Sequence, residues 1–214
     1  MIIENAITMF FRPLIGQRYK DILILGESHY CDKGCSDCGI IRAHPECADF
    51  TKRVITDYLD PRNEREGWMN TYLKFERSLV GHETTSGESA RIWDSIAFYN
   101  YLQVAMGGPR QAGTSEQYRQ AGTALFEVLE QLRPKLMIAW GKQLWRNLPS
   151  TYWTDSDTLV VRTRSGIVEH EDVGYYTLPS GHVVHALCVY HPSAGYDWSY
   201  WHDVIEAMKE KINI

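Results

Sequence analysis

The chain has 214 residues, of which 44% are hydrophobic and 23% are charged, and its net charge is −5 at pH 7. This size and composition predict one globular domain with a sizeable core. The acidic balance argues against a generally basic nucleic-acid binder, although it leaves room for a local basic face. The sequence lacks an apolar run of the ~20 residues that a membrane helix needs and a signal-peptide pattern at its start, so we expect a cytoplasmic, monomeric protein with no membrane partner.

The first part of the chain predicts a helix, a buried strand and a loop, in that order. Apolar residues at helical spacing predict an opening helix over residues 2–11. Residues 22–25 are an unbroken aliphatic run that stops at Gly26, which is typical of a strand buried on both faces in a parallel sheet. The segment 31–47 that follows is rich in Cys, Asp and Gly and is expected to be a loop.

The middle of the chain predicts helices, with one strand between them. Apolar faces predict helices over residues 50–59, with Asp49 as the cap, and 67–79, and a short turn of helix over 89–93. Residues 96–101 read as a second strand that reaches Asn100 near its end. A long helix is expected over residues 115–132, with Ser115 as its cap.

The last part of the chain returns to the alternation of strand and helix. Residues 136–140 predict a third buried strand that stops at Gly141, followed by a helix over 142–148. Short strands are expected over 159–161 and 174–177, a fourth main strand over 183–190, and a closing helix over 198–212. This alternation predicts an α/β fold with a mostly parallel sheet, covered by helices on both faces, in a single domain over residues 1–214.

Polar side chains follow three of the four main strands. Because the carboxyl ends of parallel strands meet at one edge of a sheet, residues far apart in the sequence are expected to converge there. They are Glu27, Ser28 and His29 after the first strand, Asn100 at the end of the second, and His191 and Ser193 after the fourth.

A carboxylate, an amide and an imidazole make a chemically useful set. Glu27 can hold or deprotonate a water molecule, Asn100 can read an amide-like edge, and His191 can donate to an oxygen that gains negative charge. Each residue taken singly also has an ordinary structural interpretation. Glu27 then caps a helix or faces solvent, Asn100 ends a strand, and His191 is held in an extended turn before Pro192.

Four landmarks in order along residues 22–193 resemble the uracil-DNA glycosylase superfamily. The first is Gly-Glu-Ser-His-Tyr at 26–30, and the second is the segment 97–101 that contains Asn100. The third is Leu-Arg-Pro-Lys at 132–135 with the apolar strand and Gly141 that follow, and the last is Tyr-His-Pro-Ser at 190–193.

The resemblance implies a three-layer α/β/α sandwich with a central, mostly parallel four-stranded sheet. It also implies base-excision DNA repair: hydrolysis of the N-glycosidic bond of a flipped damaged base, uracil or a deaminated purine. By position, Glu27 and Ser28 handle the water, and His191 stabilises charge on the departing base. Base contacts are implied for Gly26, His29, Tyr30, Asn100 and Ser193.

A protein of the same fold that binds a nucleotide or a nucleic acid without cleaving it is the alternative. Ser28 and His29 stand where relatives have aspartate and proline, and this altered first motif favours the alternative, as does the acidic net charge.

A cluster of cysteines follows the first motif directly. Four thiols at this spacing, Cys31, Cys35, Cys38 and Cys47, suffice for a tetrahedral metal site, and we expect zinc, with no organic cofactor. Some relatives hold an iron–sulfur cluster with four cysteines, but those cysteines are placed differently along the chain. Four reduced cysteines in a loop are the other interpretation.

Overall fold

The computed structural model describes residues 9–31, 45–108, 111–163, 166 and 168–214. The helices in this part of the chain are η3 (Pro45–Asp49), α1 (Phe50–Leu59), α2 (Met69–Val80), α3 (Ser86–Trp93), α4 (Ser115–Leu132), α5 (Lys142–Arg146) and α6 (Trp198–Ile212). The strands are β1 (Leu14–Ile15), β2 (Ile22–Gly26), β3 (His29–Tyr30), β4 (Ala97–Asn100), β5 (Ala105–Met106), β6 (Leu136–Trp140), β7 (Trp153–Asp155), β8 (Leu159–Arg162), β9 (Val168–Glu171), β10 (Val173–Thr177) and β11 (Val183–Val189). Across these residues, each helix is too short or too polar to span a membrane.

The described part of the chain forms a seven-stranded sheet in the order β1-β4-β2-β6-β11-β10-β7. Its four central strands, β4, β2, β6 and β11, run parallel. The outer strands β1, β10 and β7 pair antiparallel. The mixed α/β class and the parallel centre predicted from the sequence are therefore confirmed, and all four predicted main strands lie in that centre.

The expectation of a four-stranded sheet is wrong, because three antiparallel strands extend it. Two of them, β1 with two residues and β7 with three, are too short to show a periodic pattern in the sequence. The third, β10, was expected as a short strand and pairs with β11 from Val173↔Leu187 to Thr177↔Val183. Such short outer strands depend on the neighbouring strand rather than on their own sequence.

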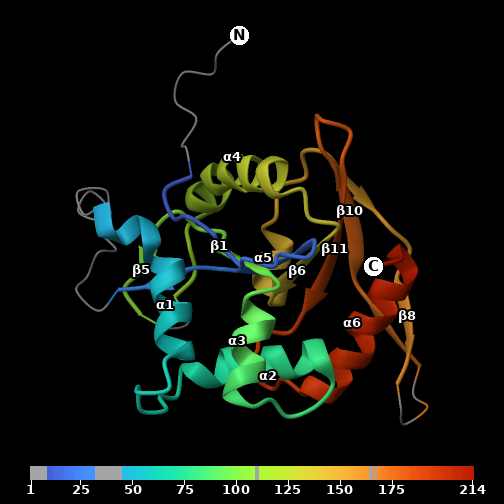
Figure 1. Cartoon of the computed structure of the whole chain (residues 1–214). Coiled ribbons are helices and arrows are strands. Elements are labelled where there is room, and N and C mark those ends of the chain that lie inside the picture. Colours follow the sequence, from blue (N-terminus) through green and yellow to red (C-terminus); the bar gives the residue numbers. More distant parts are fainter. Residues whose placement is uncertain (1–8, 32–44, 109–110, 164–165, 167) are drawn as a thin grey trace.

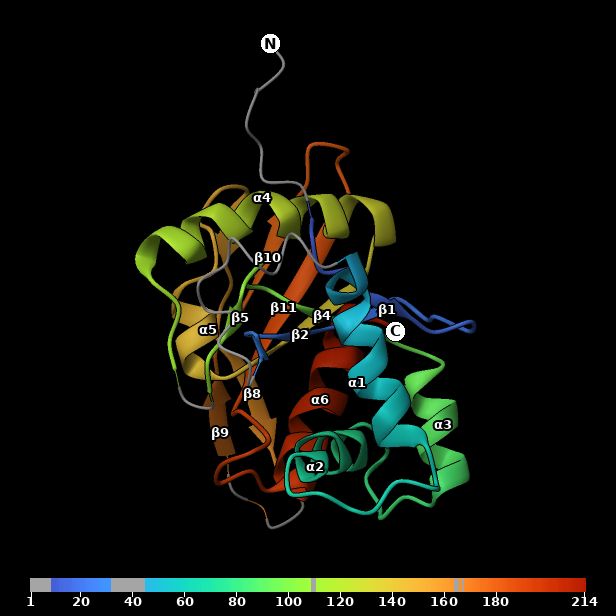
Figure 2. The same ribbon diagram turned by 90° about the vertical axis from the view of Figure 1, so that its left-hand side faces the viewer.

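Helices cover both faces of the sheet, and each face has its own hydrophobic core (Figure 1, Figure 2). Alternate residues of β2 point to opposite faces. Ile24 packs in the cluster with α1, α2, α3 and α6, whereas Leu23 and Leu25 pack in the cluster with α4 and α5. All three side chains are fully buried, which explains why this strand reads as a continuous aliphatic run.

The predicted long helices are confirmed as α1, α2, α4 and α6, with smaller differences elsewhere. Helix α3 is longer than the single turn expected, because Thr85 and Glu88 form a capping box at its start. The predicted opening helix over 2–11 falls largely outside the described residues, and residues 9–11 are not helical.

The order of the parallel strands places a switch point beside β2. The chain passes from β2 to β4 through α1, α2 and α3 on one face, and from β4 to β6 through α4 on the other. The two neighbours of β2 in the sheet, β4 and β6, are thus reached by crossovers on opposite faces. In open α/β sheets, ligands bind outside the carboxyl ends of the strands at such a point.

The N-terminal cap of α4 can be assigned to one residue and tested by substitution. The sequence predicted Ser115, but Thr114 is the cap, since its hydroxyl accepts from the Gln117 amide at 3.2 Å while the Gln117 side chain accepts from the Thr114 amide at 2.8 Å. We expect Thr114→Ala to lower the free energy of unfolding in urea by about 1 kcal/mol, and Ser115→Ala to change it by less than about 0.5 kcal/mol. Equal effects of the two substitutions would contradict this assignment.

Candidate functional site

The close approach of Asn100 to Gly26 is the central contact of the candidate site. The two residues are register partners at the carboxyl ends of β2 and β4. A Cβ atom added to Gly26 would lie 2.3 Å from Asn100 Oδ1 and 3.3 Å from the Phe98 ring. Position 26 therefore excludes any larger residue while the Asn100 carboxamide lies over the end of β2.

His29 holds the Asn100 carboxamide from the other side. Asn100 Nδ2 lies 3.2 Å from both ring nitrogens of His29, and Thr51 Oγ1 lies 2.9 Å from Nε2. The three groups are satisfied together when Nδ1 accepts from the amide and Nε2 donates to the hydroxyl. The His29 ring stacks on Phe50 at 4.6 Å. Both His29 and Asn100 are 4% exposed, so they lie beneath the surface of the site.

The environment of His29 keeps its imidazole neutral. Burial, and then the positive charge of Arg53, lowers the pKa of His29 to about 3. A neutral ring accepts a hydrogen bond from an amide, which an imidazolium cannot do. His29 therefore acts as a support for Asn100 rather than as a group exposed to a ligand.

Glu27 is held by a chain of hydrogen bonds on the α4 side of the sheet. The Tyr118 hydroxyl donates to Glu27 Oε1 and accepts from Gln143 Nε2 at 3.1 Å. Burial, and then the Glu27 carboxylate, raises the pKa of Tyr118 to about 12, so the phenol stays a donor. One oxygen of Glu27 is thereby fixed in place. No hydrogen bond from another described residue reaches Oε2, so this oxygen can accept from a water molecule or a ligand.

His191 follows β11 and carries a defined tautomer. The Ser193 backbone N–H donates to His191 Nδ1 at 3.2 Å, and Ser193 Oγ lies 2.7 Å from the same nitrogen. Because Nδ1 accepts, the proton of the neutral ring sits on Nε2. Burial lowers the pKa of His191, which favours this neutral form. The residue thus offers a neutral N–H donor at the sheet edge.

Some candidate residues come together and others lie across the sheet from them. Gly26, Asn100 and His29 form one contact group, and an aromatic row connects it to His191. In this row, Phe98 is 5.2 Å from Trp140, and Trp140 is 6.0 Å from the His191 ring. Glu27 follows β2 directly and points to the face of the sheet opposite Asn100, which continues the alternation of side chains along the strand.

The remaining candidates are peripheral or outside the described residues. Ser28 is half-buried, and Tyr30 is 45% exposed on β3. Cys31 and Cys47 both pack against the small cluster of Phe11 and Ala105. Cys35 and Cys38 lie outside the described residues, and within the described part no three His, Cys, Asp or Glu side chains group as metal ligands.

Three polar residues of this site were not found from the sequence. Tyr118 lies within the long helix predicted over residues 115–132, and its hydroxyl orients Glu27. Gln143 and Thr51 lie in ordinary helical segments, and their roles arise from contacts with residues 25 and 22 positions away, Tyr118 and His29. A sequence pattern does not record contacts of this kind.

Neither a protein-family model nor a curated protein matches the chain.

The neutral state of His29 predicts how stability depends on pH. The unfolded chain takes up a proton at this residue near pH 6.5, and the folded chain does so only near pH 3. Between these values the unfolded state binds more protons, so the contribution of His29 to the free energy of unfolding falls with falling pH, by up to about 1.4 kcal/mol per unit.

Urea unfolding between pH 7 and pH 4.5 measures this slope. We expect His29→Gln to lose less stability over this interval than the wild-type chain, whatever its stability at pH 7. The exposed His170→Gln is the matched control and should keep the wild-type slope. Parallel pH profiles for the wild-type chain and His29→Gln would show that His29 titrates normally in the folded state.

Proposed function

We propose that this protein is an N-glycosidic hydrolase that acts on a flipped damaged base in DNA, on a uracil-DNA glycosylase-like fold. The observation that carries the proposal is the approach of the Asn100 carboxamide to Gly26 at the sheet edge that also bears Glu27 and His191. Four parallel central strands between helical layers support the three-layer fold that the resemblance implies. A switch point at β2 supports ligand binding at this edge.

Asn100 is the residue that reads the base. One N–H of its carboxamide faces His29, and the second N–H and Oδ1 suit the amide-like edge of uracil or of a deaminated purine. Its support by His29 and Thr51 fixes the plane of the amide. A fixed amide discriminates between bases because a mismatched edge leaves buried polar groups unpaired.

Glu27 and His191 share the chemistry of bond cleavage. Glu27 Oε2 accepts a proton from the water whose oxygen attacks the anomeric carbon of the sugar. The C–N bond breaks, its electron pair leaves with the base, and the base later takes up a proton. His191 Nε2–H donates to the base oxygen on which this charge develops. Ser28, next to Glu27, also contacts the water. Tyr30 and Ser193 contact the base.

Base release from oligonucleotides tests the proposal. Single- and double-stranded substrates with uracil, hypoxanthine or xanthine should lose the base, and Glu27→Gln and His191→Ala should each slow release by about 10²-fold or more. Gly26→Ala should do the same without removing a polar group, since it displaces Asn100. The exposed His170→Gln is the control and should match the wild-type rate.

The same oligonucleotides distinguish the alternative function, binding without cleavage, from base release. Saturable binding of these oligonucleotides by the folded wild-type protein, without release of any base, would identify a binding protein on this fold. The contacts that occupy Asn100 and Glu27 Oε1 are compatible with such a role. In that case Gly26→Ala should weaken binding, while Glu27→Gln should leave it largely unchanged.

We also infer that Cys31, Cys35, Cys38 and Cys47 hold zinc. The packing of Cys31 and Cys47 against one small cluster supports this, because it anchors the first and last of the four at the same place. Thiolates suit zinc, and bound zinc would stabilise the segment that carries the four cysteines.

Elemental analysis of the purified protein tests the zinc site. We expect about one zinc per chain, loss of that zinc in Cys31→Ser, and a lower melting temperature after chelation. Cys188→Ala removes a buried thiol of β11 and should keep the metal. Iron in place of zinc in the same measurement would indicate a cluster, and metal-free protein at full stability would refute the site.

A further inference from the structure

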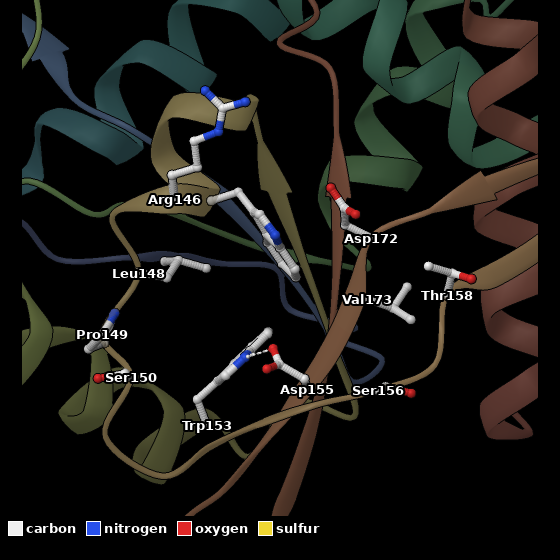
Figure 3. Close-up of a pocket in the computed structure, with 11 residues that line it drawn as sticks. Arg146, Leu148, Pro149, Ser150, Trp153, Asp155, Ser156, Thr158, Asp172 and Val173 are labelled. Carbon is white, nitrogen blue, oxygen red and sulfur yellow. Dashed lines mark hydrogen bonds between the residues drawn. The ribbon is translucent and has the colours of Figure 1, made fainter.

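A cavity of about 420 Å³ lies between α5, strand β7 and the start of β10 (Figure 3). The residues of the candidate glycosylase site do not line it. Its walls include Trp145 at the end of α5 and Trp153 on β7, together with the carboxylates of Asp155 and Asp172. A volume of this order accommodates a small molecule or a single side chain.

The two indoles stand as two walls of a corner. Their ring centroids are 5.2 Å apart and their planes meet at 83°. Both residues are half-buried, so each indole is held by the protein and still reaches the cavity. Perpendicular indoles around an open space provide two electron-rich surfaces to one guest.

Trp153 is fixed in this position by its neighbours. A Cβ atom at Gly174 would lie 2.1 Å from its ring, so the indole lies directly against the β10 backbone. The ring centroids of Tyr176 and Trp153 are 4.9 Å apart. The Nε1–H of Trp153 donates to Asp155 Oδ1 at 2.8 Å. The wall is therefore preorganised, which reduces the entropy lost when a ligand binds.

The charges around the indoles favour a cation. The Asp155 carboxylate accepts from the Trp153 indole at the wall of the cavity, and the indole carries no charge. Asp172 pairs with Lys142 at 3.0 Å. Arg146 also lines the cavity, but its guanidinium extends away from Trp153 and Asp155 (Figure 3). A phosphate or other anion would meet the Asp155 carboxylate on the side of the cavity away from the Arg146 guanidinium.

We propose that this cavity binds a quaternary ammonium group. The indole faces attract a cation through the ring quadrupole, and Asp155 adds a full negative charge. A quaternary ammonium carries methyl groups in place of N–H donors, so its removal from water costs less free energy than that of a primary ammonium. This difference favours the quaternary cation in a site walled by indoles. This site is independent of the proposed glycosylase activity and shares none of its residues.

Choline and its neutral isostere 3,3-dimethylbutan-1-ol are the probes that test the proposal. In the ¹⁵N-labelled full-length protein, choline should shift the indole N–H resonances of Trp145 and Trp153 in a saturable way. The isostere at equal concentration should leave them in place, because it has the same shape and lacks the charge. Equal effects of both compounds, or none from choline, would overturn the proposal.

Substitutions locate the site. Trp145→Leu and Asp155→Asn should each weaken choline binding by about tenfold. Trp68→Leu, which removes a partly exposed indole elsewhere, is the matched control and should bind as the wild type does. Asp155 is exposed, so Asp155→Asn keeps the test valid even if Trp145→Leu fails to fold. Unchanged affinity in folded Asp155→Asn would refute the contribution of charge.

A trimethyllysine dipeptide distinguishes the source of the cation. Tighter binding than choline would indicate a methylated protein side chain as the ligand, and weaker binding would indicate a free small molecule. Absence of binding by both probes would overturn the proposal.

Discussion

Burial of β2 on both faces is the constraint on which the rest of the structure depends. The strand has neighbours on both edges and helices above and below, so each residue from Leu23 to Gly26 is buried. Its aliphatic side chains supply both cores in alternation. The first residues that escape this burial follow Gly26, and they are the polar residues of the candidate site.

The candidate site is organised by the need to satisfy buried polar groups. Asn100 is almost fully buried, and its carboxamide is supported by His29, which is in turn supported by Thr51. Glu27 is supported in the same way by Tyr118 and Gln143. The supporting residues restrict the orientation of Asn100 and Glu27. The polar groups of the site are therefore held in place before a ligand binds.

The two proposed sites differ in the charge of their polar groups. At the sheet edge, lowered pKa values keep His29 and His191 neutral, so that they accept or donate hydrogen bonds without adding charge. In the cavity beside β7, the Asp155 carboxylate accepts from the Trp153 indole, which packs against Trp145. The former suits a neutral base, and the latter suits an organic cation. Helix α5 contributes Gln143 to the first site and Trp145 to the second.

The sequence by itself determined the long elements and the polar strand ends, because hydrophobic periodicity and strand-stopping glycines are local features. Helix α6 and the strand core of β6 begin and end where the pattern predicts. Tertiary structure alone decided the number of strands, because β1 and β7 exist only through pairing with β4 and β10. It also decided which side of the sheet Glu27 faces, the support of Asn100 by His29, and the meeting of Trp145 with Trp153. Each of these contacts joins residues whose separation along the chain leaves no periodic signal, and only folding brings them within hydrogen-bonding or packing distance.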